Sequence, residues 1–252
     1  MTDRRPLPDV EGEALHVVAA ARADGFPVRI LGGVAIGILA GKAIPERLRR
    51  SYADIDLAIR SEDGGRTRSL LTTLGYEADR GFNSLHGSRR LLFYDTVNSR
   101  RMDVFVGVFR MCHELNFADR LEAVPNTLSP ADLLLTKLQI VELNQKDLAD
   151  VVTLLHACAI GDRAQVDAID LPRLELVTGA DWGWHTTVAD NLERVAAGAA
   201  ALLSEDDAAT VRSRAQAIRQ AIDRAPKSLA WKVRARLGRR MQWYELPEEV
   251  AR

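Results

Sequence analysis

The chain has 252 residues, of which 47% are hydrophobic and 27% charged, enough apolar sequence for two modest domains with buried cores. Its formal net charge of -1 gives no general reason to expect binding to nucleic acid or to an anionic membrane. Two cysteines, Cys112 and Cys158, have no CxxC spacing, which excludes a disulfide framework and a structural zinc site. No apolar signal segment or membrane-length apolar run is present, so we expect a soluble, cytoplasmic protein without membrane contact.

The first half of the chain alternates helical and extended patterns. Helical spacing over residues 11–25 ends at Gly25, and the pair Gly32–Gly33 follows a short strand and opens a second helix. A third helix is predicted over residues 66–75. The predicted strands are residues 26–31, 54–59, 89–95 and 101–109, the last two joined by the polar turn at residues 96–99.

From about residue 125 the apolar residues recur at helical spacing and no strand is expected. Ser129 before Pro130 is a good helix N-cap with proline at the first helical position. We predict two helices, separated near Asn144 and ending by Gly161.

The remainder of the chain is rich in alanine and helical in propensity. We place the domain boundary between Ala159 and Pro172. The fold class is therefore α/β (α+β): a small mixed sheet flanked by helices over residues 1–160, followed by an all-helical C-terminal domain over residues 171–252.

Two aspartates interrupt the predicted strand at residues 54–59. Residues two apart on a strand point to the same side, so Asp54 and Asp56 would present neighbouring carboxylates. Two carboxylates at such a short distance repel each other unless a cation lies between them. Magnesium prefers carboxylate oxygens as ligands. The alternative is an exposed strand end where both carboxylates are simply solvated.

Two further features favour a site. Gly32 and Gly33 would leave backbone N–H groups available to a phosphate at the start of a helix. A third carboxylate, Asp103, again lies inside an apolar run. Three carboxylates on neighbouring strands beside a glycine turn are typical of two-metal phosphoryl transfer.

These residues resemble the pattern of the DNA polymerase β-like nucleotidyltransferase superfamily. That pattern is a strand-end Gly-Gly or Gly-Ser, an Asp-x-Asp on the next strand and a third acidic residue on a later one. The helical segment after the sheet is similar to that of the abortive-infection-type bacterial branch, whose recurrent residues match Lys137, Lys146, Asp147 and Asp150. The resemblance covers roughly residues 25–158; Gly33 replaces the serine of many members, and the gap before Asp54 is longer than in compact ones.

The resemblance implies transfer of a nucleoside monophosphate from an NTP, such as ATP, to an acceptor hydroxyl. Asp54 and Asp56 would hold two Mg²⁺ ions, with Mn²⁺ as an alternative, and Asp103 would complete the second ion's ligands and accept the hydroxyl proton. Gly32 and Gly33 would bind the nucleotide.

Two cations are candidates for binding the triphosphate. Arg50 precedes the Asp-x-Asp strand, and Lys137 lies on the following helix. Arg50 is alternatively a solvated member of a basic run, and Lys137 a lysine whose stem packs at the edge of an apolar helix face. Asp147 and Asp150 share a helix face and either orient Lys137 or are solvated.

Other polar and aromatic residues are better explained by packing. His113 and Glu114 are adjacent, so they point apart on any regular element. Trp182 and His185 flank a tryptophan-rich helix start, where packing is commoner than stacking on a bound base.

The acceptor is not evident from the sequence. Residues 209–244 contain ten basic residues and a single acidic one, Asp223. This excess of positive charge is compatible with an RNA acceptor or with a solvated helix face. A small antibiotic-like molecule or a protein is equally compatible. The alternative from another class is a catalytically inactive, antitoxin-like or regulatory binding module of the same fold.

Overall fold

The computed structural model describes residues 5–246 of the chain. The chain folds into two compact units. The first unit is built from the chain up to Ile38, from Arg50–Phe109 and from Asn116–Leu128. The second consists of Leu39–Arg49, Arg110–Leu115 and the chain from Ser129 onward.

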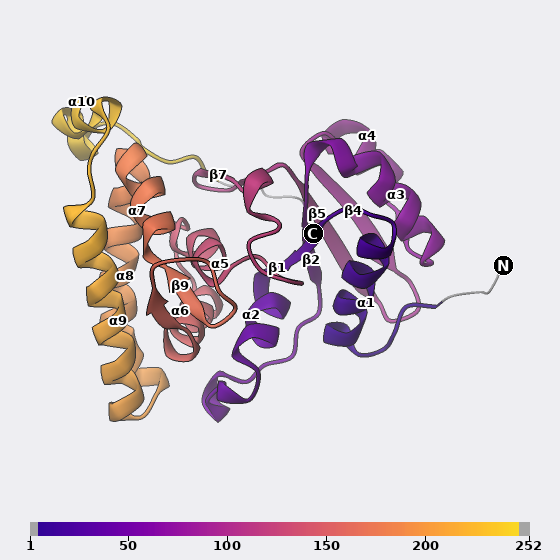
Figure 1. Ribbon diagram of the computed structural model, residues 1–252, viewed down its shortest axis with the longest axis horizontal. Helices are drawn as coiled ribbons and strands as arrows, with labels where there is room; N and C mark the ends of the chain where they lie inside the picture. The colour runs from indigo at the N-terminus through magenta and orange to yellow at the C-terminus, as the bar shows by residue number, and fades with distance from the viewer. Residues whose placement is uncertain (1–4, 247–252) are drawn as a thin grey trace. The chain divides into compact units, whose positions relative to one another are not determined.

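A mixed sheet of five strands forms the centre of the first unit (Figure 1). The strand order is β1-β2-β5-β4-β3, and β2 and β5 run parallel while the other neighbours run antiparallel. Its strands are β1 (Val28–Leu31), β2 (Ile55–Ile59), β3 (Glu77–Ala78), β4 (Arg90–Asp95) and β5 (Arg100–Val106). The accompanying helices are α1 (Val10–Ala23), α2 (Gly32–Ala40), α3 (Gly64–Thr73) and α4 (Arg80–His86), with α2 continuing into the second unit.

The two faces of this sheet differ in chemistry. One face is mainly apolar and packed, with the buried pair Asp95 and Arg100 at one end. Its apolar residues at alternate positions of the four longest strands are at most 1% exposed: Val28, Ile30, Ile55, Leu57, Ile59, Leu91, Phe93, Met102 and Val104. The other face carries the intervening residues, among them Asp56, Arg90, Arg101 and Asp103. Burial of the first face fixes the register, and the register in turn fixes which charges meet on the second.

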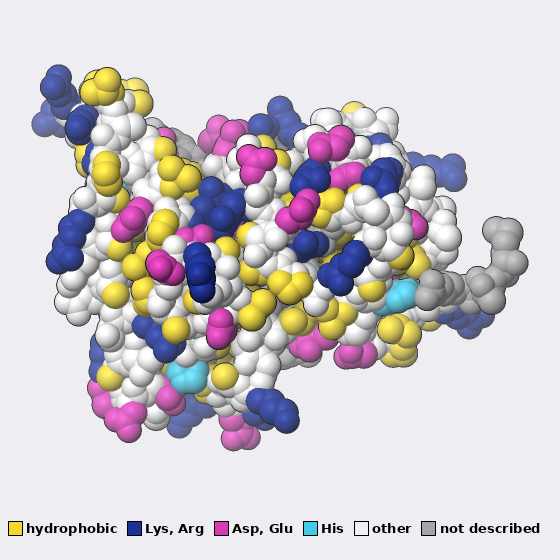
Figure 2. Space-filling model, viewed as in Figure 1, with side chains coloured by type: hydrophobic (Ala, Val, Ile, Leu, Met, Phe, Trp, Pro, Cys, Tyr) yellow, Lys and Arg dark blue, Asp and Glu magenta, His cyan; other side chains and the backbone are white. Residues whose placement is uncertain are grey.

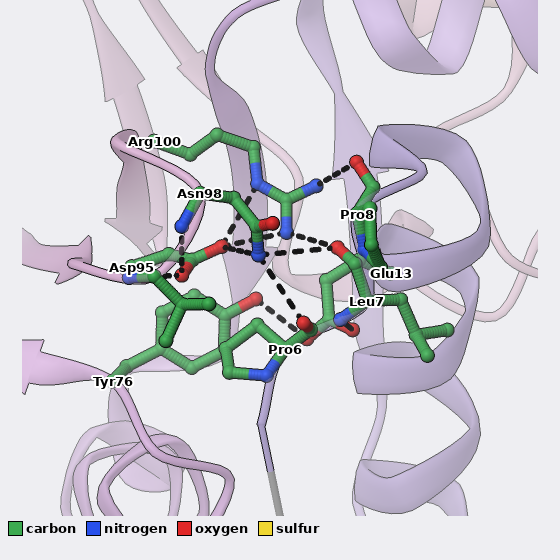
Figure 3. A network of polar contacts seen from close by, with 9 residues as sticks. Pro6, Leu7, Pro8, Glu13, Tyr76, Asp95, Asn98 and Arg100 are labelled. Atoms are coloured by element: carbon green, nitrogen blue, oxygen red, sulfur yellow. Dashed lines mark hydrogen bonds and ion pairs between the residues drawn. The ribbon is translucent and has the colours of Figure 1, made fainter.

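The chain before α1 is held to the sheet by a buried ion pair (Figure 3). Arg100 contacts Asp95 through Nε at 3.0 Å and Nη2 at 2.6 Å, and its Nη1 donates to the carbonyl of Pro8. Glu13 of α1 accepts hydrogen bonds from the Tyr76 hydroxyl and the Leu7 amide. Burial alone would raise the pKa of Asp95, but hydrogen bonds from Asn98 and Arg100 outweigh it and hold that pKa below its ordinary value.

Helices dominate the second unit, as predicted. Ser129 caps α5 with Pro130 in its first turn, and Asn144 caps α6 at the predicted break. The helices are α5 (Pro130–Leu138), α6 (Gln145–Ala157), α7 (Leu171–Ala180), α8 (Trp182–Leu202), α9 (Glu205–Arg224) and α10 (Leu229–Leu237). None of the helices within residues 5–246 combines the length and apolar character that crossing a membrane requires.

Two short strands correct the sequence prediction for this region. We expected no strand after residue 125, but β8 (Ala159–Gly161) pairs in parallel with β9 (Ala168–Asp170). Strands of three residues are too short to show an alternating pattern. A second small sheet joins β6 (Val108–Arg110) and β7 (Glu114–Asn116).

The predicted mixed sheet and helical C-terminal region are confirmed. The longest continuous part of the second unit begins at Ser129, because α5 and α6 pack with α7, α8 and α9. The boundary expected between Ala159 and Pro172 therefore lies inside the second unit, and as a boundary between independently folding domains it stays a prediction.

Replacing Asp95 with asparagine should destabilise the protein by about 3 kcal/mol, because it leaves the buried guanidinium of Arg100 without a countercharge. Since folding lowers the pKa of Asp95, its contribution is complete above the ordinary aspartate pKa of about 3.9 and is lost as pH falls through the lower folded value. Urea unfolding of wild type and Asp95→Asn at pH 7 and pH 3 measures both effects. The matched control is Glu122→Gln, because Glu122 forms an exposed pair with Arg60 and should cost less than about 1 kcal/mol. Equal costs for the two variants would contradict the assignment.

Candidate active site

Asp56 and Asp103 stand side by side on adjacent strands. They are register partners in the parallel pair β2–β5, and Asp56 is also paired with Leu31, the last residue of β1. Directly paired residues of neighbouring strands project on the same side of the sheet. The structure thus brings together two of the carboxylates predicted from sequence, at the point where β1 leads into α2.

Asp54 lies one residue before β2, on the same side as Asp56. Its side chain is 49% exposed, whereas that of Asp103 is 2% exposed. Arg101 links the two: its Nη2 lies 3.9 Å from Asp54 Oδ2 and its Nε lies 2.9 Å from Asp103 Oδ2. All three predicted carboxylates therefore belong to one face of the sheet.

Asp103 is held by two arginines. Arg90 of β4 contacts Oδ1 through both Nε at 2.8 Å and Nη2 at 2.7 Å, so two guanidinium nitrogens share one carboxylate oxygen. The contact of Arg101 with Oδ2 is an ion pair without hydrogen-bond geometry, so that buried oxygen lacks a hydrogen-bond donor among the described residues. Sequence reasoning missed both arginines. Arg101 lies two residues before Asp103 on β5, and Arg90 lies two residues before Leu92, the partner of Asp103 on β4, so both side chains share the face of Asp103.

The first glycine of the pair brings Asp56 to the start of α2. Gly32 has φ 69°, a conformation that favours glycine, and a Cβ at this position would overlap the Asp56 carboxylate. The first N–H groups of a helix have no acceptor within the helix and favour nearby negative charge. Asp56 therefore lies where a helix N-terminus stabilises an anion.

The second glycine makes room for an aromatic ring. A Cβ at Gly33 would lie 2.7 Å from Tyr52 Cδ1 and 2.8 Å from Arg50 Nη2, and one at Gly37 would lie 2.8 Å from Tyr52 Cε2. The Arg50 guanidinium lies over the Tyr52 ring at 4.9 Å from its centroid. The absence of a side chain at Gly33 therefore allows the Tyr52 ring to pack closely against α2. The sequence analysis missed Tyr52, although two glycines four residues apart indicate a helix face without side chains, against which a ring can pack.

These residues fit one divalent ion better than two. Within residues 5–246 no three His, Cys, Asp or Glu side chains are grouped so as to hold a metal ion. Magnesium, however, binds through one or two carboxylates together with waters and substrate phosphates. Asp54 and Asp56 supply that number. Guanidinium nitrogens lie 2.7 Å and 2.9 Å from the two oxygens of Asp103, whereas the contact of Arg101 with Asp54 is longer, at 3.9 Å.

Lys137 belongs to the second unit and is held there by aspartates. Its Nζ lies 2.8 Å from Asp147 Oδ1 and 2.9 Å from Asp150 Oδ2. Burial alone would lower the pKa of Lys137, but Asp150 and Asp147 outweigh it and raise that pKa. The two aspartates thus orient Lys137, one of the two roles expected for them; binding of a nucleotide by Lys137 stays a prediction.

The histidine and tryptophan candidates are packing residues within the second unit. His113 stacks on Trp184 with ring centroids 5.1 Å apart and shares a hydrogen bond with Thr187. Burial lowers its pKa to about 4 despite the nearby Asp181. Trp182 packs edge-on against Trp243.

A cavity of about 390 Å³ also lies in the second unit, between α8, α9 and α10. The charged side chains that line it form ion pairs with nearby side chains of opposite charge. Arg219 pairs with Glu193, Arg239 with Asp190, and His185 with Asp223. A polar ligand would have to displace these pairs.

The basic C-terminal segment is partly used inside the fold. Six of its ten basic side chains have partners in the second unit: Arg212, Arg214, Arg219, Lys227, Arg234 and Arg239. Arg224, Lys232, Arg236 and Arg240 show no ion pair or hydrogen bond with the part of the chain that the structure describes. Figure 2 shows basic side chains beside apolar ones over α10, where Leu229 is 81% and Val233 62% exposed.

Comparisons with solved structures find several proteins to which the chain is similar over part of its length. One is the lincosamide antibiotic adenylyltransferase LnuA, lincomycin-bound, at 15% identity, covering 57% of this chain and 96% of that chain with a TM-score of 0.43. Another is ANT(2'')-Ia in complex with adenylyl-2''-tobramycin, at 16% identity, covering 55% and 83% with a TM-score of 0.37. A third is an antigenic nucleotidyltransferase-like protein from Paracoccidioides brasiliensis, at 14% identity, covering 79% and 94% with a TM-score of 0.48.

No family model and no curated protein matches the chain. With identities of 14–16% and TM-scores of 0.37–0.48, the structural likenesses carry no argument about activity. The chemistry must therefore be argued from the site itself, and membership of the abortive-infection branch stays a prediction.

Gly37→Ala should destabilise the protein by about 1–3 kcal/mol, because the added methyl group must displace the Tyr52 ring. In a Tyr52→Ala background the same substitution should stabilise by up to about 1 kcal/mol, the ordinary preference of a helix for alanine over glycine. A double-mutant cycle from urea unfolding measures this coupling. Gly65→Ala is the control, since a Cβ at Gly65 of α3 meets nothing within 4 Å. A Gly37 effect that does not depend on Tyr52 would contradict the packing described.

Proposed function

We propose that the chain is a metal-dependent nucleotidyltransferase that moves a nucleoside monophosphate from an NTP to an acceptor hydroxyl. The observation that carries the proposal is the register of β2 and β5, which sets Asp56 beside Asp103 with Asp54 on the same face. The adjacent turn at Gly32 opens a helix whose N-terminus favours anions. The carboxylates proposed to hold a divalent ion would thus lie next to a place suited to phosphate.

Asp54 and Asp56 would hold the divalent ion, Mg²⁺ or Mn²⁺, together with phosphate oxygens of the NTP. When bound, such an ion neutralises charge on the triphosphate as pyrophosphate leaves. Arg50, beside Gly33 at the start of α2, would neutralise the phosphates further. The second ion predicted from the sequence requires Asp103 as a ligand.

The reaction joins the acceptor oxygen to the α-phosphorus and breaks the bond from that phosphorus to the pyrophosphate oxygen. The proton of the acceptor hydroxyl would pass to solvent, because both oxygens of Asp103 are in contact with guanidinium groups; the role of proton acceptor expected for Asp103 stays a prediction. Positioning of the two reactants supplies much of the rate in such transfers.

RNA, an antibiotic-like small molecule and a protein remain the candidate acceptors. The α10 region favours an anionic acceptor such as RNA, through Arg224, Lys232, Arg236 and Arg240. Binding of RNA through these residues would weaken steeply as salt rises, which separates it from the other two classes.

The test is transfer of label from each of the four α-³²P-NTPs, with Mg²⁺, to the RNA, protein or small-molecule fraction of a cell extract. We expect one fraction to be labelled, and Asp54→Asn and Asp56→Asn to reduce labelling by about 100-fold or more. Asp119→Asn, which removes an exposed aspartate of the same unit, should label like wild type.

Two results would oppose the proposal. Unchanged labelling by Asp54→Asn would show that the assigned site is wrong. Binding of an NTP without transfer to any fraction would favour the regulatory, non-catalytic module instead.

A further inference from the structure

A guanidinium group lies between two of the three carboxylates of the site. Arg101 Nε is 2.9 Å from Asp103 Oδ2, and its Nη2 is 3.9 Å from Asp54 Oδ2. A positive charge that belongs to the chain therefore occupies the region between Asp54 and Asp103, where the sequence predicts ligands for a second metal ion.

This arrangement is built into the sheet. Parallel pairing of Asp56 with Asp103 places Arg101, two residues earlier on β5, next to Asp54. Arg90 holds the other oxygen of Asp103 and is itself packed over Phe105, its Cζ 5.1 Å from the ring centroid. Asp103 is 1% exposed, so its charge needs these partners, and an arginine does not lose its proton in proteins.

The charges disfavour a second divalent ion at this point. An ion bound to Asp103 and Asp54 would have to displace Arg101 or lie against it, and like charges at such distances repel. Asp54 and Asp56 together still provide the two carboxylates that a single magnesium ion takes when a substrate supplies phosphate oxygens.

We infer that the site takes one divalent ion, at Asp54 and Asp56, and that Arg101 supplies the second positive charge from the chain. This inference rests on the proposed function, since it concerns the same site. It assigns Asp103 to the arginines instead of to a metal ion.

The experiment counts the Mn²⁺ ions retained per chain. The full chain is dialysed to equilibrium against Mn²⁺ and the non-hydrolysable analogue α,β-methylene-ATP, and the bound ions are counted by electron paramagnetic resonance. We expect one ion for wild type, one for Arg101→Lys, which keeps the charge, and two for Arg101→Ala, which exposes Asp103. Asp103→Asn should leave the count at one, whereas in a two-ion site it would reduce the count from two to one.

Arg60→Ala is the matched control, because it removes an arginine of the same unit that pairs with Glu122 at the surface, and it should retain one ion. Unfolding curves in urea show that each variant is folded. Two ions on wild type would overturn the inference while supporting the proposed function. One ion on Arg101→Ala would equally overturn the role of Arg101. Retention of neither Mn²⁺ nor the analogue by wild type would overturn the proposed function as well.

Discussion

The parallel pairing of β2 with β5 is the constraint on which the site depends. It sets the carboxylates of Asp56 and Asp103 next to each other on one face of the sheet. Two like charges this close destabilise a fold unless positive groups lie near them. Two arginines stabilise the carboxylate of Asp103, and the N-terminus of α2 lies beside the carboxylate of Asp56.

The opposite face of the sheet makes this charged face possible. Apart from the buried ion pair of Asp95 and Arg100 at one end, that face consists mainly of Ile, Leu, Val, Met and Phe side chains with almost no exposure. Burial of these side chains supplies the free energy that holds the register. A slip of one residue would turn Asp56 and Asp103 into the apolar core. The position of the carboxylates therefore follows from packing on the other side of the same strands.

Each glycine in the segment that follows β1 makes room for a different neighbour or backbone conformation. Gly32 adopts a positive φ and admits the Asp56 carboxylate, while Gly33 and Gly37 admit the Tyr52 ring and the Arg50 guanidinium. The glycine-rich start of α2 is thus explained by close approach of named side chains as well as by its suitability for phosphate. The same feature supports both the local packing and the proposed binding of a nucleotide.

Much of this was predictable from the sequence, because the patterns in residues 54–59 and 101–109 mark β2 and β5, and Ser129 and Asn144 mark helix starts. The strand predicted over residues 101–109 is, however, divided at Gly107 into β5 and β6. The residue paired with each strand residue could not be predicted, because the register of a sheet depends on contacts between residues that are distant in sequence. Arg90 and Arg101 were missed because an arginine near a strand end looks like any solvated residue until its neighbour is known. Tyr52 was missed for the same reason.

The central claim is that Asp54 and Asp56 bind a cation and nucleotide beside the glycine turn, with Arg101 on Asp103. Anomalous X-ray diffraction from crystals grown with Mn²⁺ and a non-hydrolysable NTP analogue tests it most directly. The account predicts a single manganese peak in contact with Asp54, Asp56 and phosphate oxygens, near the first turn of α2. A nucleotide bound elsewhere, or no manganese at these two aspartates, would contradict it.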